Sequence, residues 1–156
     1  MARPRVVIYC DGACSPNPGM GGWGAVLLMP ERPDARREIS GAEKHSTNNR
    51  MELTAALMAL RALKSPCDVD VYTDSRYLRD AFEAGWLERW QRNGWRTSDK
   101  KAVANEDLWR ALLSLTDTHA VRWHWVRGHA GHAENDRADA LAVAAREALA
   151  AQRGRR

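Results

Sequence analysis

The sequence has few of the features that mark membrane, secreted or disulfide-rich proteins. Its three cysteines form no CxxC pair, and their odd number argues against a disulfide framework or a zinc ribbon. The longest stretch without a charged residue, residues 12–30, is interrupted by proline and glycine, so it cannot form a membrane-spanning helix. The apolar run at residues 6–10 is shorter than the roughly 7–15 residues of a secretory signal. We therefore expect a cytoplasmic protein that does not enter a membrane.

Phenylalanine is also scarce, with one residue against seven tryptophans, but the overall composition is ordinary. Hydrophobic residues at 44% and charged residues at 28% are typical of a globular protein, which argues against a disordered chain. A length of 156 residues fits one domain with an adequate hydrophobic core. The net charge of +4 permits a polyanionic partner without establishing one.

The patterning of apolar residues predicts an α/β fold. Runs of β-branched and aromatic residues predict strands at residues 5–11, 23–30, 35–40, 68–74 and 120–127. Apolar residues at steps of three and four predict helices at residues 49–63, 105–115 and 134–150, with further helical runs within 75–101. Short turns favour antiparallel pairing of the first three strands, and the intervening helix favours a fourth strand parallel to the first. The expected order is βββαβααβα, with a five-stranded mixed sheet.

Two of these predicted strands end at an aspartate, Asp11 in YCDG and Asp74 in YTDS. Sites in open α/β sheets form at the carboxyl ends of strands, so adjacent parallel strands would bring these side chains together. Glu52 and Asp139 lie in the first turns of two predicted helices. Converging carboxylates repel each other unless cations neutralise them, and an all-oxygen ligand set suits Mg²⁺ or Mn²⁺.

Each carboxylate also has a local explanation that needs no metal. Asp11 precedes a glycine, a common turn pair, and Asp74 can cap the helix that follows it. Glu52 stands three residues after Asn49, as in a capping box, and Asp139 can belong to a solvated helix face. The spacing alone leaves the metal site and these local roles equally open.

A glycine pattern, Gly19-x-Gly21-x-x-Gly24, matches the dinucleotide-binding fingerprint. That fingerprint requires the glycines to open a helix, whose N-terminus then binds the pyrophosphate. Here the glycines lead into the strand predicted at residues 23–30, so we interpret them as a glycine turn.

Two histidines, His129 and His132, follow the last predicted strand. A structural zinc site needs four ligands, usually including cysteine, and no cysteine lies nearby in the sequence. A histidine on a glycine-bearing loop is suited to proton transfer near neutral pH, although an incidental surface histidine explains it equally well.

The segment at residues 76–101 combines seven Lys and Arg with four Asp and Glu and carries Trp86, Trp90 and Trp95. Basic residues can neutralise phosphates, and aromatic rings can pack against sugars or bases. Alternatively, the tryptophans form a small core surrounded by solvated arginines. We expect both descriptions to hold in part.

Taken together, the motifs resemble the bacterial ribonuclease HI family. They occur in the family's order and spacing: DGACSPNPGMGGWGA, STNNRMEL, YTDSRYL, GWRTSDKK, NEDLWR and VRGHAGHAENDRADALA. The resemblance covers essentially residues 5–147, and STNNRMEL, TDS and GHAGHxxN in combination are highly specific. It implies the ribonuclease H-like fold, with helices on both faces of the sheet, in a domain at residues 1–147. It also implies a basic protrusion at residues 76–101 and leaves a basic, flexible tail at residues 148–156.

The resemblance implies an endonuclease that hydrolyses the RNA strand of RNA–DNA hybrids and leaves 5′-phosphate and 3′-hydroxyl ends. The family's metal ligands fall on Asp11, Glu52, Asp74 and Asp139. Up to two Mg²⁺ ions, or Mn²⁺, about 3.5–4 Å apart would activate the attacking water and stabilise the leaving oxygen. The family's loop histidine falls on His129, which we expect to move protons rather than bind metal. A hybrid duplex is the expected partner, and the protein is expected to be a monomer.

Nucleic-acid contacts follow from the same resemblance. Because the 2′-hydroxyl distinguishes RNA from DNA, the family's minor-groove readers matter most for substrate choice. The implied contacts are Asn17, Asn48 and Asn49 in the minor groove, Thr47 and Asn105 on a DNA phosphate, Tyr77 and Trp86 against the DNA side, and Arg89, Arg92 and Arg96 in the basic protrusion. The sequence departs from the family at His45, where relatives often carry Arg, and at Arg76, where Gln is frequent.

Two other functions are consistent with parts of the pattern. A transposase or junction resolvase shares the fold but lacks STNNRMEL and GHAGH together. A hybrid-binding module without catalysis would not need the four carboxylates and His129, all of which are intact. A metal-dependent cleavage assay separates the second alternative from the enzyme.

Overall fold

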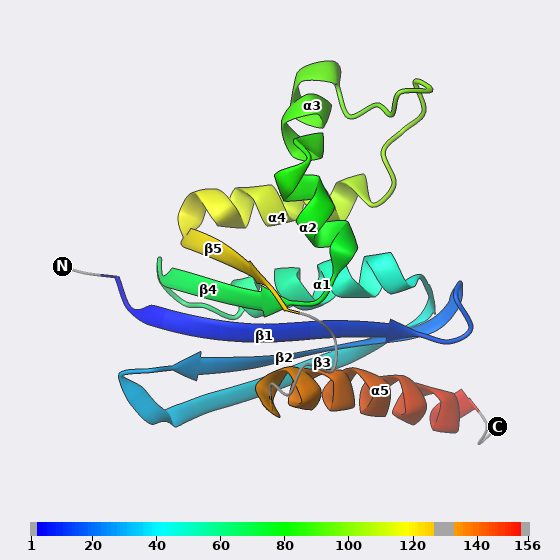
Figure 1. The fold of residues 1–156 in the computed structure, drawn as a ribbon. Coiled ribbons are helices and arrows are strands. Elements are labelled where there is room, and N and C mark those ends of the chain that lie inside the picture. Colours follow the sequence, from blue (N-terminus) through cyan, green and yellow to red (C-terminus); the bar gives the residue numbers. More distant parts are fainter. Residues whose placement is uncertain (1–2, 127–132, 154–156) are drawn as a thin grey trace.

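The computed structural model describes residues 3–126 and 133–153, which form a sheet with helices on both faces (Figure 1). The strands are β1 (Arg5–Cys14), β2 (Gly19–Met29), β3 (Arg32–Ser46), β4 (Asp68–Thr73) and β5 (Ala120–Trp125). The helices are α1 (Asn48–Arg61), α2 (Arg76–Glu83), α3 (Trp86–Asn93), α4 (Glu106–Thr118) and α5 (Ala133–Arg153). The predicted α/β fold and its five strands are confirmed.

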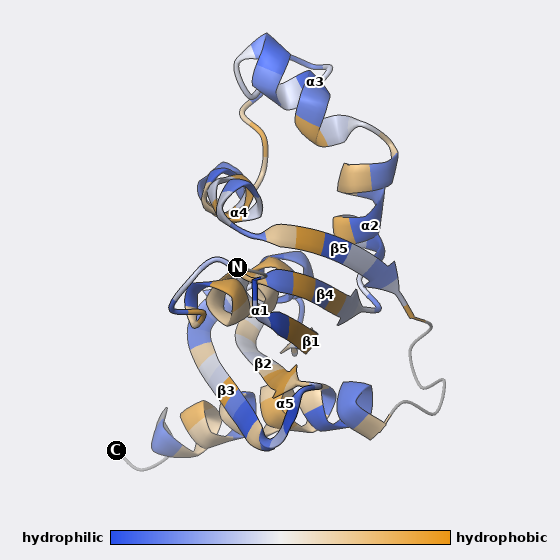
Figure 2. Ribbon diagram, turned by 90° about the vertical axis from the view of Figure 1, so that its left-hand side faces the viewer, coloured by the Kyte–Doolittle hydropathy of each residue, from blue (hydrophilic) through white to orange (hydrophobic). Residues whose placement is uncertain are grey.

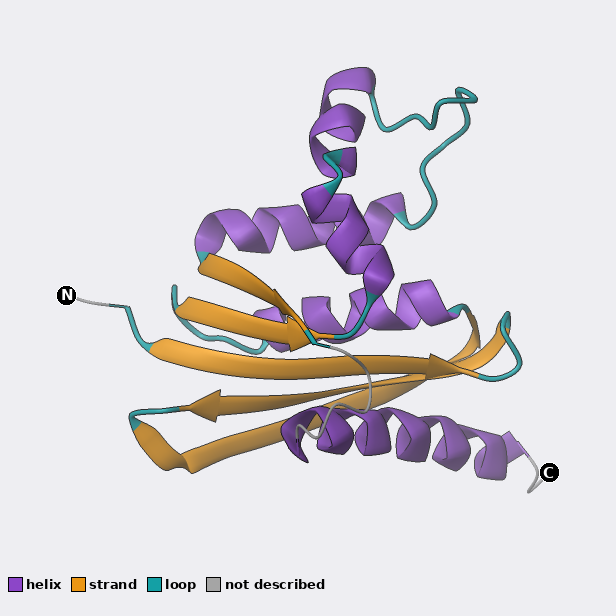
Figure 3. Cartoon of the chain, in the orientation of Figure 1, coloured by secondary structure: helices purple, strands orange, loops and turns teal. Residues whose placement is uncertain are grey.

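The helix order differs from the prediction in the basic segment. Residues 76–93 form two helices, α2 and α3, so the observed order is βββαβαααβα. Gly85 separates them because its φ of 74° is left-handed, a conformation that ends one helix before the next begins. A long loop joins α3 to α4, and α3 stands away from the sheet (Figures 1 and 3).

The strands are ordered β3-β2-β1-β4-β5. β1, β2 and β3 pair antiparallel and β4 is parallel to β1, as the connections predicted. β5 is parallel to β4, a pairing that was not predicted. β2 begins at Gly19, so all three glycines of the pattern lie inside a strand. This confirms that the pattern is not a dinucleotide fingerprint, but the interpretation as a glycine turn is wrong. β3 is much longer than predicted because it pairs with nearly the whole of β2.

β1 does not end at Asp11 as predicted. It continues to Cys14 because its antiparallel pairing with β2 persists as far as the pair Cys14 and Gly21. Its parallel pairing with β4 stops earlier, at Tyr9 and Tyr72. Asp11 therefore lies in the part of β1 that extends beyond its pairing with β4, where its side chain lines a cavity.

The core lies between the sheet and α1, while α5 packs against β1, β2 and β3 on the other face (Figure 2). Its buried side chains include Ile8, Cys10, Ala25, Leu27, Leu53 and Leu60. α5 continues to Arg153, so the tail expected from residue 148 is helical up to that residue. Alanine, abundant in this segment, is the strongest helix former. No helix in the described ranges is long and apolar enough to cross a membrane.

An ion-pair cluster around the buried Asp70, on β4 and β5, was not predicted. Asp70 accepts hydrogen bonds from Arg122 Nε at 2.8 Å and Nη2 at 3.0 Å, and its Oδ1 lies 2.8 Å from His124 Nε2. The bonds from Arg122 are the main reason that the pKa of Asp70 lies well below its usual value.

We expect Asp70→Asn to lower the free energy of unfolding by about 1–2 kcal/mol at neutral pH, since Arg122 and His124 are partly solvated. A carboxyl whose pKa is depressed in the folded state stabilises above its unfolded pKa of about 3.9, and this contribution is lost as pH falls through the folded value. The difference from wild type, measured by urea unfolding, should therefore shrink toward about pH 3. Asp34→Asn, at an exposed position on β3, is the control. Equal stability of the Asp70 variant and wild type at neutral pH would contradict this assignment.

Candidate active site

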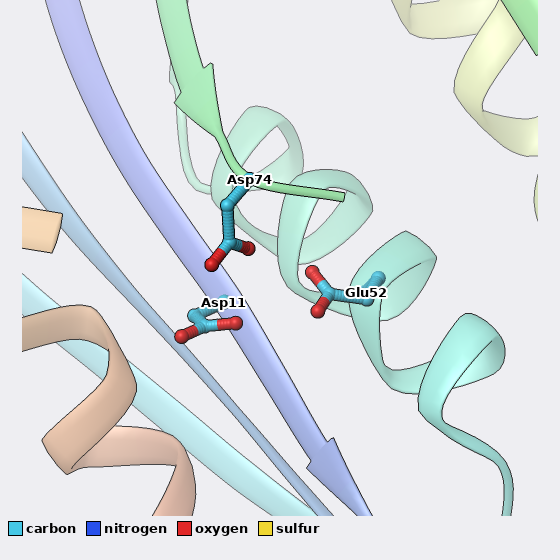
Figure 4. Close-up of side chains that lie close together, drawn as sticks. All are labelled: Asp11, Glu52 and Asp74. Carbon is cyan, nitrogen blue, oxygen red and sulfur yellow. The ribbon is translucent and has the colours of Figure 1, made fainter. Parts of the chain in front are cut away.

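Three carboxylates from three separate elements converge beside the sheet. Asp11 comes from β1, Glu52 from α1, and Asp74 directly follows β4. One oxygen from each of them lies within 4.8 Å of the others, and Figure 4 shows the three side chains directed toward a common point. This geometry is that of a site for a multiply charged cation.

The helix caps show that two of the local explanations for these carboxylates are wrong. Thr47 caps α1 by accepting a hydrogen bond from the backbone N–H of Arg50, so Glu52 is not the partner in a capping box. Ser75, rather than Asp74, caps α2 by accepting from the Leu78 N–H. The turn explanation for Asp11 is also wrong, because that residue lies inside β1.

Two glycines bring the neighbouring helices close enough to complete the site. A Cβ added at Gly12 would lie 2.5 Å from the backbone nitrogen of Glu52. One added at Gly22 would lie 2.1 Å from the Ala142 carbonyl oxygen. Only glycine allows α1 and α5 to approach the sheet this closely, which positions Glu52 and Asp139.

The carboxylates line a cavity of about 480 Å³. Asp139 lines it too but lies outside the tight trio of carboxylates, and its hydrogen bond with Asp11 contributes to the raised pKa of Asp11. Asn48, Asn49 and Tyr77 share this cavity, whereas Asn17, Thr47, Trp86 and Asn105 are not among its lining residues. Residues that we did not expect there are Cys14, Ser75, Arg76, Asn135 and Asp136. The sequence could have pointed to Asn135 and Asp136, because both lie in the family motif VRGHAGHAENDRADALA.

Burial and mutual repulsion disfavour the charged forms of Asp11 and Glu52 in the absence of a cation. Burial, followed by the charges of Asp74 and Asp139, raises the pKa of Asp11 to about 8. Burial and the same kind of repulsion also raise the pKa of Glu52 well above its usual value. Its Oε2 atom is buried and has no hydrogen-bond partner within the described residues. An unpaired oxygen in an all-oxygen set fits a hard divalent cation, so the cluster can hold a metal ion.

Two of the predicted minor-groove readers, Asn17 and Asn48, are linked by hydrogen bonds next to the carboxylate cavity. The Asn48 N–H donates to Asn17 Oδ1 at 3.1 Å, and the Cys14 N–H donates to Asn48 Oδ1 at 2.8 Å. These bonds fix the loop after β1 against the start of α1. The structure thus brings Asn17 and Asn48 together beside the carboxylates.

Thr47 and Asn105 line a second cavity, of about 410 Å³, together with His45 and Arg50. Arg50 was not predicted, yet its guanidinium binds the Asp107 carboxylate at 2.8 Å and lies 3.4 Å from Asn105 Oδ1. Asn105 is also bonded to the Tyr77 hydroxyl, which ties this cavity to α2.

The basic segment contains the expected tryptophan core. Trp90 lies between Trp86 and Trp95, with ring centroids 5.9 and 6.0 Å away, so the tryptophans form a small core. The arginines around this core are exposed: Arg89, Arg92 and Arg96. None of these residues lines the carboxylate cavity, and their contact with nucleic acid stays a prediction. His129 lies outside the described residues.

Comparisons with known proteins agree with this geometry. The family model described as RNase H matches residues 3–147. Ribonuclease H of Bradyrhizobium diazoefficiens is 59% identical over 139 residues, covering 89% of this chain and 88% of that protein. Ribonuclease H of a Chelativorans species is 60% identical over 140 residues, covering 90% of this chain and 84% of that protein.

Solved structures show the same fold. The crystal structure of LC9-RNase H1, a type 1 RNase H with the type 2 active-site motif, has a TM-score of 0.83 at 36% identity and covers 95% of this chain and 74% of its own. LC11-RNase H1, solved in complex with an RNA/DNA hybrid, has a TM-score of 0.71 at 20% identity, covering 92% of this chain and 98% of its own. Because the identity to the second structure is only 20%, this likeness shows the fold alone.

Proposed function

The chain belongs to the RNase H family, and we propose that it is an endonuclease that hydrolyses the RNA strand of RNA–DNA hybrids. The observation that carries this proposal is the convergence of Asp11, Glu52 and Asp74 within 4.8 Å in an open polar cavity. The high identity to proteins named Ribonuclease H supports the choice of substrate.

We propose that the ligands of up to two Mg²⁺ ions, with Mn²⁺ as the alternative, are Asp11, Glu52, Asp74 and Asp139. When bound, such ions would activate the attacking water and stabilise the leaving 3′ oxygen, which gives 5′-phosphate and 3′-hydroxyl ends. The protein's part is to hold these oxygens in place and to release the protons that the raised pKa values of Asp11 and Glu52 retain. We propose that His129 transfers protons near the site and does not bind metal.

We propose that the neighbouring polar residues select and orient the hybrid. Asn48 and Asn49, which line the carboxylate cavity, would read 2′-hydroxyls there, together with Asn17, which accepts a hydrogen bond from Asn48. Thr47 and Asn105, in the second cavity, would hold a phosphate of the DNA strand. Trp86 would pack against the DNA side, together with Tyr77, whose ring it contacts.

Neutralising the basic protrusion with Arg89→Gln, Arg92→Gln and Arg96→Gln should raise KM and flatten its salt dependence, with little change in kcat. Each lost phosphate contact should reduce the slope of log affinity against log salt by about 0.9. The matched control neutralises three exposed charges far from the site: Arg32→Gln, Arg61→Gln and Lys64→Gln. Equal salt slopes for the two triple variants would mean that the protrusion is structural only.

The test of the proposed function is cleavage of end-labelled RNA, with and without Mg²⁺. The substrates are an RNA–DNA hybrid, double-stranded RNA and single-stranded RNA of the same sequence. We expect magnesium-dependent cleavage of the hybrid's RNA strand only. Hybrid binding without cleavage under any divalent metal would instead support the binding module.

We also propose a monomer that works in the cytoplasm. One chain supplies Asp11, Glu52, Asp74 and Asp139, so the site needs no residue from a second copy. The cysteines are free, as a reducing compartment would keep them: Cys10, Cys14 and Cys67. Light scattering at working concentration would test the monomer.

A further inference from the structure

A third cavity, of about 340 Å³, lies on the far side of the loop between β1 and β2 from the carboxylates. Lys44 and His45, near the end of β3, line one wall, and Arg146 and Glu147, on α5, line another. The loop itself contributes Ser15 and Pro16. None of the sequence motifs assigned above predicts a role for Lys44 or Arg146.

Arg146 has an unsatisfied hydrogen-bond donor at this cavity. Its Nε atom is buried and has no hydrogen-bond partner among the residues that the structure describes. Buried donors are normally paired, so this guanidinium is suited to bind an acceptor that the described residues do not supply. A guanidinium presents several donors in a planar fork that matches a phosphate. Lys44 adds a second positive charge, and His45 adds a third when protonated, against the one negative charge of Glu147.

This cavity is a neighbour of the one that holds Thr47 and Asn105. Both are lined by Gly19, at the start of β2, and His45, near the end of β3. A strand whose phosphate is held at Thr47 and Asn105 would pass His45 on its way out. The next positive charges on that path are those of Lys44 and Arg146.

We propose that Lys44 and Arg146 bind a backbone phosphate of the DNA strand, beyond the phosphate held at Thr47 and Asn105. The site extends the footprint of the hybrid past the carboxylate cavity and makes the protein sensitive to the length of the DNA strand. This inference rests on the proposed function, because it assumes that the second cavity holds the DNA strand.

The test compares wild type with Lys44→Gln/Arg146→Gln in steady-state cleavage of three hybrids. One is a short blunt duplex, one has the DNA strand extended at either end, and one has the RNA strand extended. We expect a DNA extension at one end to lower KM for wild type but not for the variant. On that substrate the variant should have an unchanged kcat, a KM about three- to tenfold higher, and a salt slope smaller by about 0.7–0.9.

Two controls keep the outcome unambiguous. Arg61→Gln/Lys64→Gln removes two positive charges at the opposite end of α1 and should behave as wild type. Lys44→Gln alone, an exposed substitution that cannot disturb α5, should show part of the effect. Equal KM values for the Lys44→Gln/Arg146→Gln variant and wild type on the extended hybrids overturn the inference. A response to the RNA extension alone overturns the assignment to the DNA strand. Failure of wild type to cleave any hybrid contradicts the proposed function instead.

Discussion

Asp11→Asn should abolish hybrid cleavage while leaving hybrid binding measurable. Asp11 is the most central of the carboxylates, since Glu52, Asp74 and Asp139 all interact with it. An amide in its place removes a negative ligand without removing volume, so we expect cleavage to fall by at least about a thousandfold. The measurement is single-turnover cleavage with Mg²⁺, paired with hybrid binding. Asp117→Asn, at an exposed position on α4, is the control and should cleave as wild type. Wild-type turnover by the Asp11 variant would falsify the metal-ligand assignment.

The same substitution should stabilise the metal-free protein at neutral pH. The folded pKa of Asp11, about 8, lies above its unfolded value of about 3.9, so between these values the folded state holds a proton that the unfolded chain has lost. Stability of wild type therefore falls as pH rises through this window, and Asn removes that loss. We expect a gain on the order of 2 kcal/mol near pH 8 that vanishes below about pH 4. Urea unfolding across this range, without divalent metal, measures it, and a gain that is independent of pH would contradict the electrostatic cause.

Gly22→Ala should cause the largest loss of stability of any single-methyl substitution near the site. The added Cβ would lie 2.1 Å from the Ala142 carbonyl oxygen and 2.9 Å from the Arg146 backbone nitrogen. Both atoms belong to the backbone of α5, so no side chain can move aside and the helix itself must shift. We expect the free energy of unfolding to fall by about 3 kcal/mol, together with loss of cleavage, because α5 carries Asp139.

The control for this prediction is Ala144→Ser, on the exposed face of the same helix, which should change stability by less than about 1 kcal/mol. Urea unfolding and cleavage under native conditions measure both effects. Wild-type stability in Gly22→Ala would mean that α5 does not pack against β2 as closely as the structure shows.

Local patterning was sufficient for the type and order of most elements. Alternating and continuous apolar runs locate the five strands, and leucines at steps of three and four locate α1. The motif order identifies the family and, through it, Asp11, Glu52, Asp74 and Asp139 as candidates. The rejection of the glycine fingerprint also needed only the strand that follows it. These features are readable because each depends on residues that are neighbours in the chain.

The site itself depends on contacts between distant residues. Asp11 lies inside β1 rather than at its end, because β2 continues alongside it after β4 has stopped. Glu52 reaches the same point because Gly12 lets α1 approach the sheet, a contact that no periodicity encodes. The bonds that Asp70 accepts from Arg122 on β5 likewise join residues far apart in the sequence. Strand register and close packing depend on the whole fold. The sequence therefore identified the carboxylates of the site, whereas only the tertiary structure showed how they are arranged.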